Sequence, residues 1–143
     1  MKLKSWLWMA LFVLFTLSNA QLLAQALSGT YTIDPSGSGA SNFTTFASAL
    51  TSLNTNGISG PVIFEVAANA IFAESPLTIT ATGTAVNTIT FRKSGSGTNP
   101  RINSTGTTGL SDAIIKLSGS DYITFEQIDL YDATDRIEFG IHL

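Results

Sequence analysis

Acidic side chains are concentrated near the end of this 143-residue chain, and they are its best candidates for chemistry. Asp129, Asp132 and Asp135 recur at every third position, with Glu126 and Glu138 on either side. Oxygen ligands of this kind bind calcium, and two carboxyl groups roughly 5–10 Å apart can cleave a glycosidic bond. The spacing matches no calcium loop, because an EF-hand places acids at alternate positions around a central glycine. We therefore expect a solvated corner of the fold, with a calcium site and a catalytic pair as the alternatives.

Basic residues offer a second kind of chemistry. Arg92, Lys93 and Arg101 could clamp the carboxylate of a uronic acid through charge-assisted hydrogen bonds. They stand among glycines and serines, however, which favours solvated corners. His142 is the only histidine, so neither a Ser-His-Asp triad nor a metal site with two histidines can be built from this chain. We assign no catalytic residue.

Exposed aromatic residues could bind sugars. Tyr122, Tyr131 and Phe139 are the candidates for a platform on which sugar rings stack. Aromatic side chains in repetitive β structures more often fill interior rows, and we favour this interpretation over the sugar platform. The elements that carry the three residues decide between the two.

The first residues have the three zones of an export signal: a positive start, an apolar run and small residues before a cleavage point. The apolar run, Trp6–Leu17, is shorter than the about 20 residues that a membrane span requires. Residues 1–20 are therefore predicted to be a signal peptide cleaved after Ala20, or else after Ala26, with an uncleaved anchor as the alternative. Cleavage implies a mature chain that is secreted or held at the cell surface.

Without the signal the chain is acidic. Loss of two signal lysines leaves five of the seven basic residues against ten acidic ones, a net charge of −5. A surface of this sign repels phosphate backbones and anionic lipids, which argues against nucleic-acid and membrane partners. The chain has no cysteine, so its stability must come from packing and backbone pairing.

One segment after the signal has the spacing of an α-helix. An apolar stripe at helical spacing runs from Phe43 to Leu53. Ser41 or Asn42 can cap its start, and Asn56-Gly57 supplies a left-handed exit. The apolar side of this helix must cover other residues, and we expect it to close one open end of a sheet.

The remainder of the chain predicts β structure. Short runs of β-branched and aromatic residues alternate with turn-forming residues. The predicted strands are Thr30–Ile33, Val62–Val66, Leu77–Thr80, Thr88–Phe91, Ile114–Leu117, Tyr122–Phe125 and Ile128–Leu130. Comparable positions recur at spacings of 23 and 26 residues, as in Ile79, Ile102 and Ile128. A parallel β-helix explains this recurrence, because each coil supplies short strands that stack on the next coil, and a β-sandwich is the alternative.

These residues resemble the entry to pectin-lyase-like right-handed parallel β-helices. The resemblance is carried by Asn42–Leu50, Gly60–Val66 and Ile71–Ile79, where a capping helix leads into a first strand and then a second one. Leu117–Phe125 is similar to the coils of large secreted bacterial β-helix proteins, which often end in a sorting domain for type IX secretion. The resemblance implies an all-β, right-handed parallel β-helix with an N-terminal capping helix over residues 27–143.

The last residues predict an unfinished fold. Ile137–Leu143 reads as a strand with no closing element after it. We expect the domain to be truncated here, and the bare strand edge to favour aggregation or fraying.

Two functions remain open at this stage. We favour a non-catalytic secreted or cell-surface scaffold, similar to an adhesin, that binds polysaccharide along a flank or contacts other cell-surface components. The alternative is the N-terminal part of a polysaccharide-active enzyme, a lyase, glycoside hydrolase or carbohydrate esterase, whose catalytic coils lie beyond residue 143. Pectin-lyase-like folds commonly host such enzymes, but a fold alone assigns no activity. No cofactor is expected apart from calcium at Asp129, Asp132 and Asp135.

Overall fold

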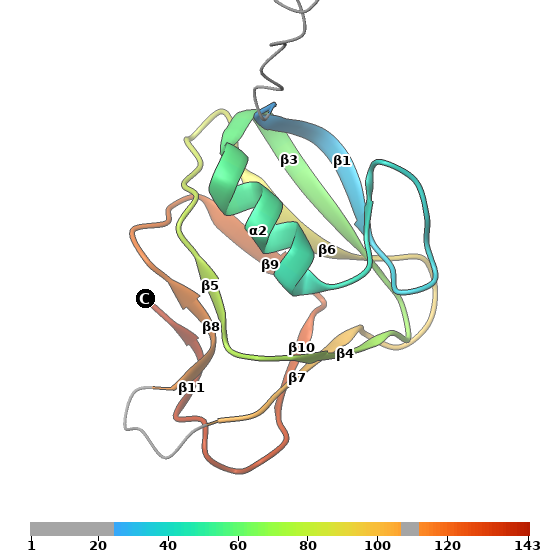
Figure 1. Ribbon diagram of the computed structural model, residues 1–143, viewed down its shortest axis with the longest axis vertical. Helices are drawn as coiled ribbons and strands as arrows, with labels where there is room; N and C mark the ends of the chain where they lie inside the picture. Colours follow the sequence, from blue (N-terminus) through green and yellow to red (C-terminus); the bar gives the residue numbers. More distant parts are fainter. Residues whose placement is uncertain (1–24, 107–111) are drawn as a thin grey trace, which may run out of the picture.

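The computed structural model describes residues 25–106 and 112–143, which fold as a parallel β-helix built from three sheets, named A, B and C here (Figure 1). Sheet A contains β2 (Asn42–Phe43), β1 (Leu27–Ile33), β3 (Ile58–Ala67), β6 (Ile89–Ser94) and β9 (Ile123–Glu126). Sheet B contains β4 (Ile71–Glu74), β7 (Arg101–Ser104) and β10 (Asp129–Asp132). Sheet C contains β5 (Leu77–Ile79), β8 (Ala113–Leu117) and β11 (Phe139–His142).

The chain visits the three sheets in turn, so β3, β4 and β5 form one coil, β6, β7 and β8 the next, and β9, β10 and β11 the last one described. All strand pairings within the described residues are parallel. The predicted parallel β-helix is therefore confirmed, and the β-sandwich, which requires antiparallel sheets, is excluded. The predicted signal peptide, residues 1–20, lies outside the described residues, and both predicted cleavage points leave β1 whole.

Inward side chains of successive coils stack in rows because the strands pair in register. Phe64, Phe91 and Phe125 occupy equivalent positions of β3, β6 and β9. Their ring centroids lie 4.7 Å and 5.1 Å apart, with interplanar angles of 11° and 12°. Phe64 and Phe91 are fully buried. This aromatic ladder forms the core on the sheet A side, where Phe91 stacks with one face on Phe64 and with the other on Phe125.

The capping helix starts later than the sequence predicts. α2 spans Phe46–Asn56, and Thr45 is its N-cap, whose side chain accepts a hydrogen bond from the backbone N–H of Ser48. Phe43, predicted to open the helix, instead belongs to β2 and pairs with β1. The prediction of Ser41 or Asn42 as the cap is therefore wrong. The first residue of the apolar stripe, Phe43, is in an extended backbone at β2 and not in the helix. The exit at Gly57 is confirmed, with φ of 63° and a hydrogen bond to the carbonyl of Leu53.

α2 covers the N-terminal end of the core, as Figure 1 shows where the helix lies across the first coil. Its buried residues are Phe46, Ala49, Leu50 and Leu53. Phe46 packs edge-on against Phe72 of β4, with ring centroids 5.0 Å apart. The side-chain amide of Asn54 donates to the carbonyl of Thr78 and accepts from the N–H groups of Thr80 and Ala81. α2 thus covers the apolar interior and also satisfies backbone groups on the edge of sheet C.

Two features of the coil repeat were not predicted correctly. β4 and β7 were absent from the predicted strands, although each contributes a short strand to sheet B. The spacing that aligned Ile79, Ile102 and Ile128 joined residues of different rows, because Ile102 pairs with Phe72 and Leu130. Coil lengths vary with the corners, so a fixed period read from isoleucines alone cannot recover the register.

Candidate functional site

The outward face of sheet B gathers polar and aromatic side chains. Side chains alternate along a strand, so every second residue of β4, β7 and β10 points away from the core. These outward residues form two in-register rows, Ile71–Arg101–Asp129 and Ala73–Asn103–Tyr131. We call this surface the sheet B face.

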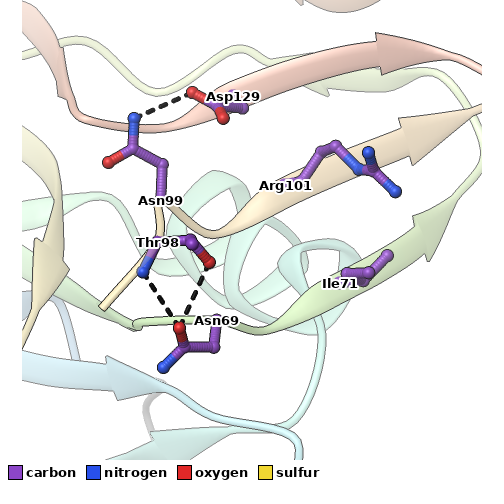
Figure 2. Close-up of a pocket in the computed structure, with 6 residues that line it drawn as sticks. All are labelled: Asn69, Ile71, Thr98, Asn99, Arg101 and Asp129. Atoms are coloured by element: carbon purple, nitrogen blue, oxygen red, sulfur yellow. Dashed lines mark hydrogen bonds between the residues drawn. The ribbon is translucent and has the colours of Figure 1, made fainter. Parts of the chain in front are cut away.

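One end of the sheet B face holds a shallow pocket of about 280 Å³, shown in Figure 2. It is lined by Asn69, Ile71, Thr98, Asn99, Arg101 and Asp129. The Nδ2 of Asn99 donates to the Oδ1 of Asp129 at 2.9 Å, which fixes the carboxylate at one side (Figure 2). The Oδ1 of Asn69 accepts from the backbone N–H and the hydroxyl of Thr98. These bonds hold polar groups from successive coils around one hollow.

Arg101 links this pocket to Tyr131. Its guanidinium carbon lies 4.8 Å from the centroid of the Tyr131 ring, a cation–π contact. Tyr131 as a whole remains 48% exposed, so the contact with Arg101 does not bury it. The Nε of Arg101 is buried and has no hydrogen-bond partner within the described residues. Arg101 therefore keeps an unused donor beside an open aromatic ring.

A second shallow pocket, of about 370 Å³, continues the same face. It is lined by Ala73, Glu74, Ser75, Asn103, Thr105 and Ala133. The Oδ1 of Asn103 is buried and likewise lacks a hydrogen-bond partner in the part of the chain that the structure describes. Since buried polar atoms are nearly always paired, Arg101 and Asn103 are groups that a ligand could satisfy.

The structure separates the acidic residues that the sequence grouped. Asp129 lies on the sheet B face, Asp132 ends β10, and Asp135 lies in the turn that follows, with φ of 54°. Glu138 instead accepts from the backbone N–H of Asp112. Residues 25–106 and 112–143 contain no group of three or more His, Cys, Asp or Glu side chains arranged to hold a metal ion. Calcium binding at these residues stays a prediction.

Asp132 stabilises the turn that follows β10. Its Oδ1 accepts from the N–H and hydroxyl of Thr134, and its Oδ2 accepts from the N–H groups of Arg136 and Ile137. Desolvation raises the pKa of Asp132, but the hydrogen bonds from Ile137, Thr134 and Arg136 outweigh it and lower the pKa from 3.8 to about 2. Both carboxylate oxygens are engaged in shaping the turn.

The three predicted basic residues do not form one clamp. Arg92 lies on sheet A and pairs with Glu65, with its Nη2 2.8 Å from the Oε1 of Glu65. Lys93 contacts the carbonyl of Gly97 and the Oδ1 of Asn99 at the corner beyond β6. Arg101 alone lines the pocket of the sheet B face. The hypothesis of a uronate clamp built from all three is not supported by this arrangement.

The predicted aromatic platform is also divided. Tyr122 precedes β9 in sheet A and is 54% exposed, whereas Phe139 belongs to β11 in sheet C and stacks on His142 at 4.9 Å. Only Tyr131 lies on the sheet B face. All three side chains are exposed to solvent, so the expectation that they fill interior rows is wrong, but they lie at three different sheets and form no common platform.

Sequence reasoning missed the amides that complete this face: Asn69, Asn99 and Asn103. Asn69 adopts φ of 65°, a left-handed conformation that asparagine tolerates well, so it was indistinguishable from an ordinary turn residue. Asn99 and Asp129 are separated by 30 residues. The register of sheet B, in which Arg101 pairs with Asp129, brings them together, and the spacing read from the isoleucines did not contain it.

Comparisons with protein-family models, with curated proteins and with solved structures found no match to this chain. No helix among the described residues has the length and apolar character needed to cross a membrane.

Proposed function

We propose that this chain is a non-catalytic, secreted or cell-surface β-helix scaffold that binds neutral polysaccharide on the sheet B face. The contact between Arg101 and Tyr131 carries the proposal. It presents an open aromatic ring, an unused donor on Arg101 and an unused acceptor on Asn103 along two adjoining pockets. Sugar rings have apolar faces and hydroxyl edges, so they match an aromatic surface bordered by polar groups.

The shape of the face supports a chain-like ligand. The two pockets are open and shallow, and they lie next to each other on β4, β7 and β10. A compact small molecule needs an enclosed cavity that buries most of its surface. An extended polysaccharide instead makes modest contacts at successive subsites, and linked contacts add up to useful affinity.

The charges support a neutral rather than an acidic polysaccharide. Arg101 is the one basic residue of the two outward rows, and Asp129 lies beside it in the same row. After signal removal the chain has a net charge of −5 and therefore repels polyanions. Salt screens this repulsion only beyond the Debye length. A pectate-like ligand would be repelled, and Arg101 alone among the outward residues would attract it.

The export signal and the resemblance to pectin-lyase-like proteins support the location. Residues 1–20 have the zones of a signal peptide, and proteins of the resembled class are secreted or displayed by bacteria. Polysaccharides are abundant outside cells, so the proposed ligand and the proposed location agree.

Affinity gel electrophoresis tests this function. The chain is run through gels containing a neutral polysaccharide, such as galactomannan or xyloglucan, and through gels containing polygalacturonate. We expect retardation in a neutral polysaccharide gel, with Tyr131→Ala weakening the affinity roughly tenfold, as for loss of an aromatic anchor.

Tyr122→Ala is the matched control, because Tyr122 is equally exposed but lies at sheet A. It should leave the retardation unchanged. Unfolding of both variants in urea shows whether the fold is retained. Retardation by polygalacturonate alone, equal losses in both variants, or no retardation in any gel would contradict the proposal.

A further inference from the structure

The two pockets of the sheet B face lie toward opposite ends of the same three strands. We call the pocket of about 280 Å³ the first pocket and that of about 370 Å³ the second. On the last described coil, Asp129 lines the first pocket and Ala133 the second. On the coil before it, Arg101 lines the first pocket, whereas Asn103 and Thr105 line the second. Each pocket takes residues from all three coils, so the two pockets are offset along the strands.

Tyr131 lies between the two pockets. It stands two residues after Asp129 and two residues before Ala133, and it points outward from β10. Arg101, which lines the first pocket, reaches the Tyr131 ring at 4.8 Å. In Figure 2 the side chain of Arg101 extends along its strand and away from Asn99. The face therefore offers three positions in a line along the strands: a pocket, an aromatic platform and a second pocket.

This line has a definite length and direction. Lining residues of the two pockets stand four positions apart on one strand, as do Asp129 and Ala133. At a rise of about 3.3 Å per residue, the separation is roughly 13 Å. A few sugar rings in an extended chain cover this distance, whereas one ring does not. A sugar chain that ran across the strands, along the axis of the β-helix, would contact one pocket or the other but not both.

The surface between the pockets is even. β4, β7 and β10 pair over all of their residues, without a shift in register. A ligand must therefore be straight to contact both pockets and Tyr131 at once. Cello- and manno-oligosaccharides are straight because both linkage bonds of each ring are equatorial, whereas the axial bond of malto-oligosaccharides makes those chains curve. A ligand that is already straight in solution also loses less freedom on binding.

We propose that the sheet B face binds a straight, ribbon-like neutral glycan that lies parallel to the strands and fills three subsites: the first pocket, the Tyr131 platform and the second pocket. The inference rests on the function proposed above, and it specifies the class of ligand and its direction. Each subsite adds contacts within one molecule, so affinity rises with chain length until all three subsites are filled. Longer chains gain little more.

A series of oligosaccharides tests the size of the site. Cello- and manno-oligosaccharides, from the disaccharide to the hexasaccharide, are titrated into the full chain, and dissociation constants are obtained from NMR shifts. In at least one of these series, we expect affinity to rise roughly tenfold from the disaccharide to the tetrasaccharide and less than about twofold beyond it. The tetrasaccharide of the malto series should bind at least about tenfold more weakly.

A variant that fills the second pocket tests whether both pockets are used. Ala133→Leu places a larger side chain there and should weaken the tetrasaccharide roughly fivefold, while the affinity for the disaccharide changes less than about twofold. Ala85→Leu is the matched control, because Ala85 is likewise exposed but lies in the turn before β6. It should change neither affinity. Urea unfolding shows whether both variants keep the fold.

A nitroxide spin label at the reducing end of the tetrasaccharide shows its direction. In the proposed arrangement, the label broadens amide signals at one end of all three strands, for example those of Asn69, Asn99 and Asp129. A glycan that ran along the axis of the β-helix would instead broaden one outer strand, β4 or β10, from end to end.

The outcomes separate this inference from the proposed function. If Tyr131→Ala weakens binding, but the label broadens β4 or β10 from end to end or affinity keeps rising to the hexasaccharide, the arrangement along the strands is wrong and polysaccharide binding on sheet B stands. Equal affinity for the malto series would overturn the ribbon-like class of ligand. Binding of none of these oligosaccharides would overturn the inference, and absence of retardation in the polysaccharide gels as well would overturn the proposed function.

Discussion

The carboxylate of Glu74 accepts a 2.7 Å hydrogen bond from the backbone N–H of Phe46 at the start of α2. Glu74 is the last residue of β4, so the bond ties the first coil to the helix that covers it. The first N–H groups of a helix lack partners within the helix and favour negative charge. Burial raises the pKa of Glu74 above its usual 4.5, although hydrogen bonds from Phe46 and Ala47 oppose the rise.

Removal of this carboxylate should loosen the cap. Glu74→Ala leaves a buried N–H unpaired, and we expect a loss of about 1–3 kcal/mol in the free energy of unfolding. Glu74→Gln keeps an acceptor oxygen and should lose much less. Urea unfolding measures both, and an unchanged midpoint for Glu74→Ala would contradict the role of Glu74 in the cap.

The same residue predicts a pH dependence. Because its folded pKa lies above its unfolded pKa, the stability linked to protonated Glu74 is fully present below pH 4.5 and is lost as the pH rises through the folded value. The stability of the unmodified chain relative to Glu74→Gln should therefore fall as the pH rises from 4.5 through the folded pKa. A difference that stays constant or grows with pH would show that burial does not dominate.

Asn54 should matter more than its half-buried position on α2 implies. Asn54→Ala removes three hydrogen bonds to the edge of sheet C, and we expect a loss of about 1–2 kcal/mol. Asn56→Ala is the matched control in the same helix, because Asn56 contacts only Ser52 through its side chain within the described residues. Hydrogen exchange should quicken at Thr80 and Ala81 in the first variant and remain slow in the second. Equal effects would point to helix propensity instead of edge capping.

The turn after β10 should depend on the charge of Asp132. Its folded pKa of about 2 lies below 3.8, so its stabilisation of the turn is present above pH 3.8 and is lost as the pH falls through about 2. NMR should show the amides of Thr134, Arg136 and Ile137 losing their hydrogen-bonded shifts over that range. Asp132→Asn should loosen these amides at neutral pH, whereas Asp135→Asn should not.

A calcium titration of the same sample tests the calcium prediction. Calcium binding at Asp129, Asp132 and Asp135 would have to draw the oxygens of Asp132 away from the turn amides. The NMR signals of those amides would then shift strongly. If these signals do not shift at millimolar calcium, the prediction of a calcium site is wrong.

The contribution of each phenylalanine to the free energy of unfolding should depend on its position in the aromatic ladder. Phe91→Ala opens a cavity between two rings and should cost about 3–5 kcal/mol. Phe125→Ala, at the last ring of the ladder, should cost clearly less because Phe125 is only partly buried. Urea unfolding gives both values. A larger cost at Phe125 than at Phe91 would mean that the last coil is better covered than the structure shows.

Local patterns were sufficient to predict the architecture. Short β-branched runs and one apolar stripe with a glycine exit indicated a β-helix with a helical cap, and that helix ends at Asn56, with Gly57 as its C-cap, as expected. The start of the helix was mispredicted because Phe43 suits both a helical stripe and a strand, and pairing with Ile33 of β1 decides between them. Such tertiary competition is invisible in a local pattern.

The candidate site was harder to predict because it forms across coils. Arg101 and Tyr131 were each considered, but for separate purposes, since their contact depends on the register between β7 and β10. Asp132 was considered as a calcium ligand because the sequence does not show whether an aspartate caps its own turn or faces solvent. The proposed site is made of rows of residues about one coil apart, and corner loops of variable length hide those rows in the sequence.

The most direct test of the central claim maps the binding surface. Backbone NMR spectra are recorded during titration with an oligosaccharide from the neutral polysaccharide that retards the chain most. The account predicts progressive shifts at Arg101, Asn103 and Tyr131 on the sheet B face, with sheet A unaffected. Shifts confined to sheet A or to sheet C, or no shifts at saturating sugar, would contradict it.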